Sequence, residues 1–251
     1  MSTNADADAD PDAGTGHDRR PEGNPPPHTP VRAVLFDFGH TLFAHAPGPE
    51  VLRREASLLG HDLTPDEAFA LWREIDTAAM DPAEVARGRD LDGEVWRTRW
   101  PILYGLADRV VPGIGAALDR DFHDAWSWIP YADTEAVLHG LADRGIAVGV
   151  VSNTGWDVRG PFAARGLDRF VGSFTLSYEC GIAKPEPGIF LAACQALDVD
   201  PGLTLMVGDD ARADTGALAA GLLDVVLVDP DTPIGDPHGL DQVLERVDSQ
   251  P

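Results

Sequence analysis

Polar residues that could do chemistry follow three apolar runs of the sequence, at the point where each run ends. Asp37 follows "VRAVLF", Ser152 and Asn153 follow "IAVGVV", and Asp209 with Asp210 follows "LTLMVG". Taken singly, each has a plainer interpretation as a turn or a solvated loop. Taken together, two separated carboxylate positions and a hydroxyl suit a divalent cation and an anionic substrate.

A lysine completes this set of polar residues. The chain has 19 Lys and Arg residues, and Lys184 is its only lysine. It lies in "ECGIAKPEPGIF", just before an expected helix whose N-terminal amides favour an anion. Lys184 is therefore predicted to act on the same anionic substrate.

The alternation of apolar runs and amphipathic segments predicts the framework that positions these residues. The segments that read as buried strands are 31–36, 146–151, 203–207 and 224–228. The segments that read as helices are 134–145, where Asp133 or Thr134 caps the start and Gly145 ends the helix, 185–197 and 211–221. This order predicts an α/β fold, a Rossmann-like parallel sheet with helices on both faces, in which ligands bind beyond the carboxyl ends of the strands.

A long segment without a strand pattern interrupts the alternation. Residues 46–128 contain the helical patterns 50–60, 64–80 and 90–100. Because the interval is far longer than an ordinary connection, it predicts an inserted α-helical cap over the sheet. Most of its tryptophans are expected to be anchors of a core or an interface: Trp72, Trp96, Trp100, Trp126 and Trp128.

The first 30 residues differ from the rest of the chain in composition. Residues 1–30 are rich in Ala, Asp, Gly and Pro, and they contain no large apolar residue after Met1. Such a segment cannot bury enough surface to offset its ordering entropy, so a disordered tail is predicted there. The remaining chain divides into an α/β core of residues 31–45 and 129–251 and a helical cap of residues 46–128.

Charge and composition restrict the partners and the location. The 251 residues carry a formal net charge of -23, which repels a nucleic-acid backbone or an anionic membrane surface. Two cysteines are too few for a disulfide framework. With no apolar run of membrane-spanning length and no signal-peptide pattern, a cytoplasmic protein with a small-molecule substrate is predicted. Nothing in the sequence indicates its oligomeric state.

In this order and spacing, the polar positions resemble the haloacid dehalogenase superfamily of hydrolases, most of whose members are magnesium-dependent phosphatases. The resemblance covers roughly residues 31–229, and the cap matches in kind rather than by motif. The matching stretches are "DFGHT" from Asp37, "VVSNTG" with Ser152, "GIAKPEPGIF" with Lys184, and "VGDDARADTGALAAG" with Asp209 and Asp214. Any one of them is weak, but four in the correct order are a strong signal.

The resemblance implies a role for each matching residue. Asp37 would be the nucleophile that forms an aspartyl-phosphate from a small phosphorylated metabolite. Ser152 and Lys184 would hold the phosphoryl oxygens, with Asn153 as a further phosphate contact. Mg²⁺ would be held by Asp37, the carbonyl of Gly39 and Asp209, with Asp210 or Asp214 holding its waters.

The sequence departs from the family at Gly39, where the family has a second Asp that protonates the leaving group and activates water. Loss of such acid-base help costs about 10²- to 10⁴-fold in rate. Three interpretations stay open. His40 could supply the proton, since imidazole titrates near neutral pH. The substrates could have good leaving groups, as acyl and aryl phosphates do. The protein could bind a phosphorylated ligand with little turnover.

Two other branches of the superfamily also lack the second Asp. Haloacid dehalogenases use no metal and replace the acidic fourth motif, whereas this chain keeps Asp209, Asp210 and Asp214, so a 2-haloacid dehalogenase-like hydrolase ranks below a phosphatase. Phosphonate hydrolases need a cap lysine, and residues 46–128 contain none. Four cap arginines could bind an anionic part of the substrate, although such residues more commonly form a solvated helix face: Arg87, Arg89, Arg97 and Arg99.

Overall fold

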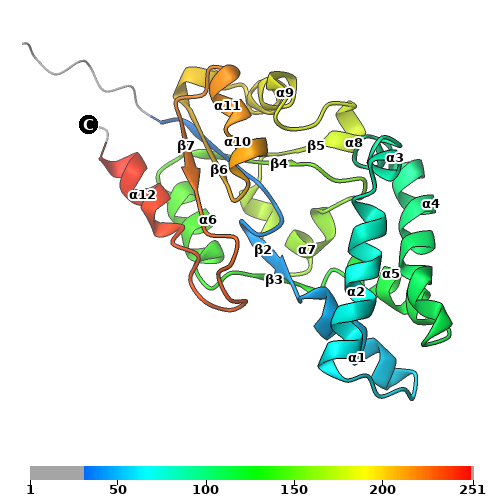
Figure 1. Ribbon diagram of the computed structural model, residues 1–251. Helices are drawn as coiled ribbons and strands as arrows, with labels where there is room; N and C mark the ends of the chain where they lie inside the picture. The colour runs from blue at the N-terminus through cyan, green and yellow to red at the C-terminus, as the bar shows by residue number, and fades with distance from the viewer. Residues whose placement is uncertain (1–30, 250–251) are drawn as a thin grey trace, which may run out of the picture.

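A five-stranded parallel sheet forms the centre of the structure, a computed structural model that describes residues 31–249 (Figure 1). The strands lie in the order β5-β4-β1-β6-β7, and each pairs in parallel with its neighbour. They are β1 (Ala33–Phe36), β4 (Ala147–Ser152), β5 (Ser173–Leu176), β6 (Thr204–Gly208) and β7 (Asp224–Leu227). Because β1 is central, the residue that follows it lies between the carboxyl ends of β4 and β6.

Helices cover both faces of this sheet because successive side chains of a strand point to opposite faces. On β1, Val34 and Phe36 belong to the core formed with α6 and α12, whereas Leu35 packs in the core formed with α9 and α11. The helices of this part are α6 (Thr134–Asp143), α7 (Arg159–Ala163), α8 (Ser177–Cys180), α9 (Pro187–Leu197), α10 (Ala211–Asp214), α11 (Gly216–Ala219) and α12 (Asp241–Asp248). The predicted α/β architecture is confirmed.

The predicted helix ends hold in part. Gly145 ends α6 in the left-handed region, as predicted, but the Asp133 side chain does not cap that helix. Its carboxylate instead accepts hydrogen bonds from the N–H groups of His238 and Leu240. The helix predicted over 211–221 is divided into α10 and α11.

Close packing at Gly216 explains where α11 lies. A Cβ at Gly216 would be only 2.2 Å from the carbonyl oxygen of Pro185. No side chain fits in that space, so glycine lets α11 pack directly on the chain that carries Lys184. The same contact keeps Lys184 close to Asp214, at the end of α10.

The structure contains three strands beyond the four predicted ones. One is β5 at the edge of the sheet. The others, β2 (Phe43–His45) and β3 (Trp128–Pro130), pair in antiparallel fashion where the chain leaves the α/β part and returns to it. These additional strands have only three or four residues. β1 and β7 are equally short, but they lie within longer apolar runs of the sequence, whereas β2, β3 and β5 do not.

The helices between β2 and β3 share a hydrophobic core of their own, separate from those of the sheet (Figure 1). They are α1 (Gly48–Leu58), α2 (Pro65–Ala79), α3 (Pro82–Val85), α4 (Gly93–Tyr104) and α5 (Ile114–His123). A capping box between Thr64 and Glu67 starts α2. This group of helices lies where the cap is expected, and we refer to residues 46–128 as the cap.

The tryptophans of the cap are anchors with one exception. Trp96 and Trp128 are buried, and Trp72 and Trp100 are half-buried against the cap core. Trp126 is 65% exposed and lies with its ring under the guanidinium group of Arg165. Trp126 is therefore not an anchor of a core among the described residues, and four of the five tryptophans agree with the expectation for most of them.

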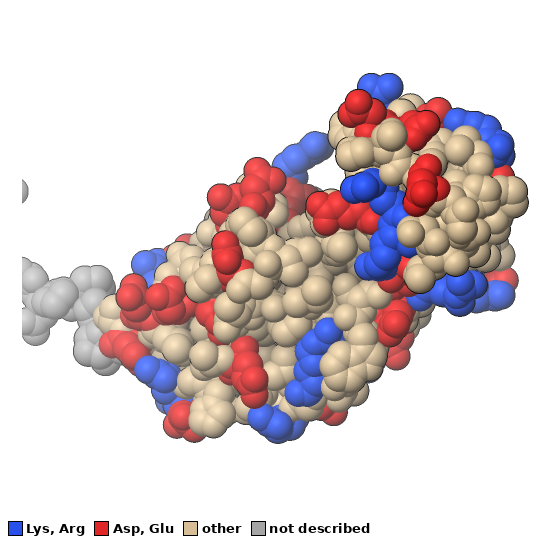
Figure 2. Space-filling view, turned by 90° about the horizontal axis from the view of Figure 1, so that it is seen from below, with Lys and Arg blue, Asp and Glu red and all other residues tan. Residues whose placement is uncertain are grey.

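The surface of the described residues mixes both signs of charge. On the face drawn in Figure 2, Lys and Arg side chains are scattered among Asp and Glu. Between residues 31 and 249, no helix has the length and apolar character that crossing a membrane requires. The disordered tail predicted for residues 1–30 lies outside the described residues.

Candidate functional site

Asp37 lies at the carboxyl edge of the sheet, directly after the central strand. Its N–H donates to the carbonyl of Val207 on β6 at 2.9 Å, and its Oδ1 accepts a hydrogen bond from the N–H of Phe38 at 2.8 Å. The side chain is 15% exposed. The backbone therefore fixes a carboxylate that still reaches the space beyond the sheet.

Lys184 is buried between two carboxylates. Its Nζ lies 2.9 Å from Oδ1 of Asp37 and 2.7 Å from Oδ1 of Asp214, and its side chain is 1% exposed. Burial by itself lowers the pKa of a lysine, but the charges of Asp37 and Asp214 outweigh burial here and raise the pKa of Lys184. The ammonium group therefore stays charged and offsets part of the negative charge beside it.

The residues that follow β4 lie next to this lysine. The Asn153 side chain donates through Nδ2 to the carbonyl of Lys184 at 2.9 Å and accepts through Oδ1 from its N–H at 2.7 Å. Since both polar atoms bind the Lys184 main chain, Asn153 positions the lysine, and its predicted contact with phosphate stays a prediction. Ser152 is buried at the end of β4 and lines the same cavity as Asp37.

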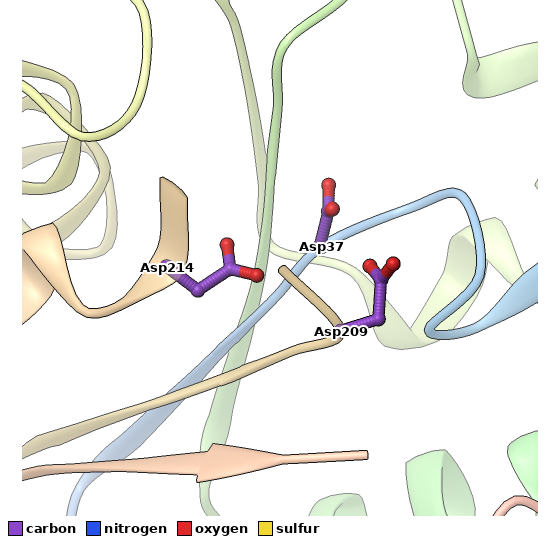
Figure 3. Close-up of side chains that lie close together, drawn as sticks. All are labelled: Asp37, Asp209 and Asp214. Atoms are coloured by element: carbon purple, nitrogen blue, oxygen red, sulfur yellow. The ribbon is translucent and has the colours of Figure 1, made fainter. Parts of the chain in front are cut away.

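Three carboxylates lie close together, as Figure 3 shows. Asp37 follows β1, Asp209 follows β6, and Asp214 lies in α10; one oxygen of each lies within 4.8 Å of the others. Asp214 is completely buried, and its Oδ2 accepts from the N–H of Asp210 at 3.0 Å. Thr41 donates from Oγ1 to Asp209 at 3.2 Å. The sequence therefore assembles a compact acidic cluster from segments that are far apart in the chain.

The electrostatics of this cluster favour a bound cation. Burial, and then the charge of Asp37, raise the pKa of Asp209. Burial is also the largest cause that raises the pKa of Asp214, to about 6, although Lys184 acts in the opposite direction. One ammonium group cannot balance three carboxylates. Since carboxylate oxygens are preferred ligands of hard divalent cations, the donor set fits such an ion.

Asp210, Gly39 and His40 lie at the margin of the cluster. Asp210 is exposed, and its carboxylate accepts from the N–H of Arg212 at 2.8 Å, which caps α10. His40 is exposed and adopts a φ of 54°, in the left-handed region. Gly39, which lies between Asp37 and His40 in the chain, is half-buried. Its role as a carbonyl ligand stays a prediction.

A cavity of about 280 Å³ lies over Asp37, and we call it the inner cavity. Its polar lining comes from the sheet edge and includes Asp37, Ser152, Lys184 and Asp209. Its aromatic lining comes from both parts of the structure and consists of Phe38, Trp96, Phe122, Trp128 and Trp156. The sequence interpretation gave none of these aromatic residues a role in the site. For Trp156, the available signal is its position four residues after Ser152.

A second cavity of about 860 Å³, the outer cavity, shares Trp96 and Trp156 with the first. Of the four cap arginines considered from the sequence, only Arg97 lines it, and none lines the inner cavity. Arg87 and Arg99 both pair with Glu84, and Arg89 donates to the carbonyl of Ala79. These arginines therefore have partners within the cap.

The arrangement can support nucleophilic substitution on an anionic substrate. Asp37 presents an uncrowded carboxylate to the inner cavity, and Lys184 lowers the repulsion that an approaching anion would meet. Ser152 adds a hydroxyl donor at the same edge. A phosphoryl group is one electrophile that such a site can accept.

Comparison with known proteins gives consistent matches. The family described as haloacid dehalogenase-like hydrolase matches residues 31–221. A glyceraldehyde 3-phosphate phosphatase of Methanopyrus kandleri is 28% identical over 78% of this chain and 83% of that protein. A phosphoserine phosphatase of Thermus thermophilus is 34% identical over 76% and 79%. The crystal structure of a HAD phosphatase from Thermococcus onnurineus superposes with a TM-score of 0.59 at 24% identity, covering 86% of this chain and 98% of that one.

Proposed function

This chain belongs to the haloacid dehalogenase-like hydrolases, and from that premise we propose that it hydrolyses a small phosphorylated metabolite with the help of Mg²⁺, through an aspartyl-phosphate on Asp37. The coarser assignment, a phosphatase-type hydrolase, follows from the family and from the phosphatases among its relatives. The observation that carries the finer proposal is the buried Lys184 between Asp37 and Asp214, with Asp209 beside them.

The proposed reaction begins with attack of an Asp37 carboxylate oxygen on phosphorus. Lys184, whose ammonium group contacts Asp37, and the hydroxyl of Ser152 hold the phosphoryl oxygens. Asn153 keeps the Lys184 main chain in place through two hydrogen bonds. Water then attacks the phosphorus of the aspartyl-phosphate and releases the Asp37 carboxylate and phosphate.

The residues that would hold Mg²⁺ are the carboxylates of Asp37 and Asp209 and the carbonyl of Gly39, with Asp214 and Asp210 contacting its waters. Asp214 is the better supported of the last two, because it belongs to the compact acidic cluster whereas Asp210 is exposed. When bound, the cation would neutralise charge on the phosphoryl group and act as a Lewis acid.

His40 is the candidate for proton exchange in this site. It lines the inner cavity together with Asp37, and its neighbour Gly39 carries no side chain. Substitution of His40 by Asn keeps a residue type that tolerates the left-handed region while it removes the imidazole. A fall in the rate of dephosphorylation in this variant supports a role for the imidazole, and an unchanged rate excludes it.

The function is tested by hydrolysis of acetyl phosphate, which needs no proton donor for its leaving group. The wild-type protein should release phosphate in the presence of Mg²⁺, and Asp37→Asn should lower kcat by at least about 10³-fold. Asp66→Asn, an exposed carboxylate in the first turn of α2, is the matched control and should behave as the wild type. Retention of activity in Asp37→Asn would contradict the mechanism.

The alternatives give different results in the same experiments. A 2-haloacid dehalogenase releases halide from a 2-haloacid in the presence of a chelator, and the acidic cluster speaks against it because it needs a cation. A non-catalytic phospholigand-binding protein binds beryllium fluoride with Mg²⁺ and shows no steady-state hydrolysis.

A further inference from the structure

The lining of the inner cavity contains two chemically different groups of residues. The ionisable side chains include Asp37 and Lys184, where the phosphoryl group is proposed to bind. The aromatic half of the lining, against which the leaving part of the substrate would pack, consists of five residues: Phe38, Trp96, Phe122, Trp128 and Trp156.

These rings form one packed cluster across the core and the cap. The ring centroids of Phe38 and Trp128 are 4.7 Å apart, and those of Trp128 and Trp156 are 5.8 Å apart. Phe122 in α5 lies 5.6 Å from Trp156, and Trp96 in α4 lies 5.9 Å from Phe122. Such spacings are typical of aromatic pairs that interact through ring edges and faces, so the cluster can accept a further ring.

Two of the three indole N–H groups around this cavity are already engaged. The indole N–H of Trp128 donates to the carbonyl of Phe122 at 2.8 Å, and that of Trp96 lies 3.4 Å from Nε2 of His123. The Thr154 hydroxyl accepts from the main-chain N–H of Trp156. A leaving group rich in hydroxyls would find few free partners there, and burying unpaired polar groups is unfavourable.

The charges of the cavity disfavour a leaving group with an anion of its own. Lys184 is the only Lys or Arg among the residues that line the inner cavity, and it already contacts Asp37 and Asp214. A second phosphate or a carboxylate would therefore face aromatic rings. The volume of about 280 Å³ lies just below the usual range for ligand pockets, about 300 to 1,000 Å³, and so suits a small leaving group.

No carboxylic acid occupies position 39. A Cβ built at Gly39 would lie 3.7 Å from atom Cζ3 of Trp128, so an aromatic ring lies beside the position that lacks a side chain. Without an acid at this position, an oxygen that is stable as an anion leaves most readily. Phenols ionise with a pKa near 10, whereas alkanols have pKa values near that of water, about 15.7.

We propose that the substrate is an aryl phosphate monoester whose leaving group is a small, uncharged phenol that binds against the aromatic cluster. This inference rests on the proposed function and names its substrate class. An Asp37 oxygen forms a bond to phosphorus while the bond from phosphorus to the phenolic oxygen breaks. The electron pair of that bond stays on the phenolate, which takes a proton from solvent after it leaves.

The second half of the reaction is the same for every substrate. Water attacks the phosphorus of the aspartyl-phosphate, the bond to the Asp37 oxygen breaks, and the proton of the water passes to solvent or to His40. Because Gly39 provides no base for this step, hydrolysis of the intermediate limits kcat. A good aryl substrate therefore gives a burst of phenol equal to the enzyme concentration, followed by a slow steady state.

The test compares phenyl phosphate with benzyl phosphate, with Mg²⁺ present. Both esters carry one uncharged ring, but only phenyl phosphate has a stable leaving anion. For the wild type, kcat/KM for phenyl phosphate should exceed that for benzyl phosphate by about 10²- to 10⁴-fold, the loss that an absent general acid causes. Comparable kcat/KM values for the two esters would overturn the inference while leaving the proposed function intact.

Gly39→Asp is the first variant, because a Cβ fits at this position without a close contact. A carboxylic acid there should raise turnover of benzyl phosphate at least about tenfold more than turnover of phenyl phosphate. An equal effect on both esters would contradict the absence of an acid as the reason for the preference.

Trp156→Leu tests the aromatic cluster, with Trp126→Leu as a matched control outside the cavity. Trp156→Leu should lower kcat/KM for phenyl phosphate about tenfold, which corresponds to loss of about one aromatic contact. It should lower kcat/KM for acetyl phosphate, which has no ring, by clearly less than this, and the remaining turnover of acetyl phosphate shows that the variant is folded. An equal loss on both substrates would overturn the role of the ring. If none of these compounds is turned over in an Asp37-dependent way, the proposed function itself is overturned.

Discussion

Two clusters of three charged side chains have opposite compositions and lie in different parts of the molecule. In the α/β core, Lys184 lies between the carboxylates of Asp37 and Asp214. In the cap, Glu84 lies between the guanidinium groups of Arg87 and Arg99. Each cluster thus has two charges of one sign around a single charge of the other.

Burial is what separates the two clusters. The surplus charge of the cap cluster is on arginine side chains that are 52% and 24% exposed, so water stabilises it. The surplus charge of the core cluster includes Asp214, whose side chain is 0% exposed, and Asp209 adds a further carboxylate. A buried charge without compensation is unfavourable, so a bound cation would stabilise the core cluster, whereas the cap cluster has no such need. Unbalanced charge marks a functional site here only where it is also buried.

Removal of the central charge of the core cluster should have the largest effect. Lys184→Met leaves Asp37 and Asp214 facing each other in a buried site. We expect kcat/KM to fall by about 10²- to 10³-fold, since a preorganised charge at the phosphoryl group is lost. The free energy of unfolding without metal at pH 8 should fall by about 3 to 5 kcal/mol. Urea denaturation and steady-state kinetics measure the two effects.

The matched control for Lys184→Met is Arg99→Met in the cap. Arg99 belongs to the other cluster and lines neither the inner nor the outer cavity. Its substitution should leave kcat/KM within about twofold of the wild-type value. Equal losses of activity in both variants would contradict the conclusion that only the buried core cluster belongs to the functional site.

Asp214 gives the core cluster a distinctive pH dependence. Its pKa in the folded protein is about 6, above the ordinary 3.8, because burial disfavours the charged form. Asp214 therefore stabilises the metal-free fold fully below pH 3.8, and this contribution is lost as the pH rises through about 6. Between pH 4 and pH 7.5, the free energy of unfolding should fall less in Asp214→Asn than in the wild type. The two decreases should differ by on the order of 1 to 3 kcal/mol. Urea denaturation with a chelator measures this difference.

Added Mg²⁺ provides the second readout for Asp214. At pH 7.5 the cation should stabilise the wild type, because it compensates the carboxylates that burial has made unfavourable. The same addition should stabilise Asp214→Asn less. If Mg²⁺ stabilises both proteins equally, Asp214 does not take part in binding the cation.

The positions of the polar residues in the core were predictable because the order of the strands in the sequence predicts a parallel sheet. Asp37, Ser152 and Asp209 each follow a buried strand, and the carboxyl ends of parallel strands meet at one edge, so their proximity followed from the strand pattern alone. Lys184 was found by its rarity and by the helix after it. The contact between Lys184 and Asp214 was not predictable, since it depends on the close approach of Gly216 to Pro185.

The cap shows where such reasoning ends. Its helices were evident from their periodicity, but which side chains face the inner cavity depends on how the cap packs on the core. Phe122 lines that cavity although no pattern distinguishes it from an ordinary core aromatic residue. The contact between Arg99 and Glu84 was equally hidden, because it joins α4 to α3 rather than following one helix. The contact between Arg87 and Glu84 is local, since the two residues are three positions apart.

Glu84→Gln should have a smaller effect than either change in the core. Hydrogen bonding to Arg99 is the largest cause that lowers the pKa of Glu84, so its contribution to stability is present above the ordinary value of 4.5 and is lost as the pH falls. At pH 7.5 the substitution should lower the free energy of unfolding by about 1 kcal/mol. The difference from the wild type should shrink towards pH 4, the reverse of the Asp214 dependence, with kcat/KM unchanged. A loss that persists at pH 4 would point to packing rather than charge.

Arg97→Gln should have the smallest effect, and it links the cap to the substrate. Arg97 pairs with Glu94 one turn away on α4; the two side chains are 71% and 67% exposed, and solvent screens the pair. Arg97 also lines the outer cavity, where a substrate with an anionic tail would meet it. An uncharged phenol makes no use of this charge, so KM for phenyl phosphate should stay within about twofold of wild type and the melting temperature should not change. A clear rise in KM would mean that the charge of Arg97 acts on the phosphate group of phenyl phosphate itself, which would contradict the binding of that group at Lys184.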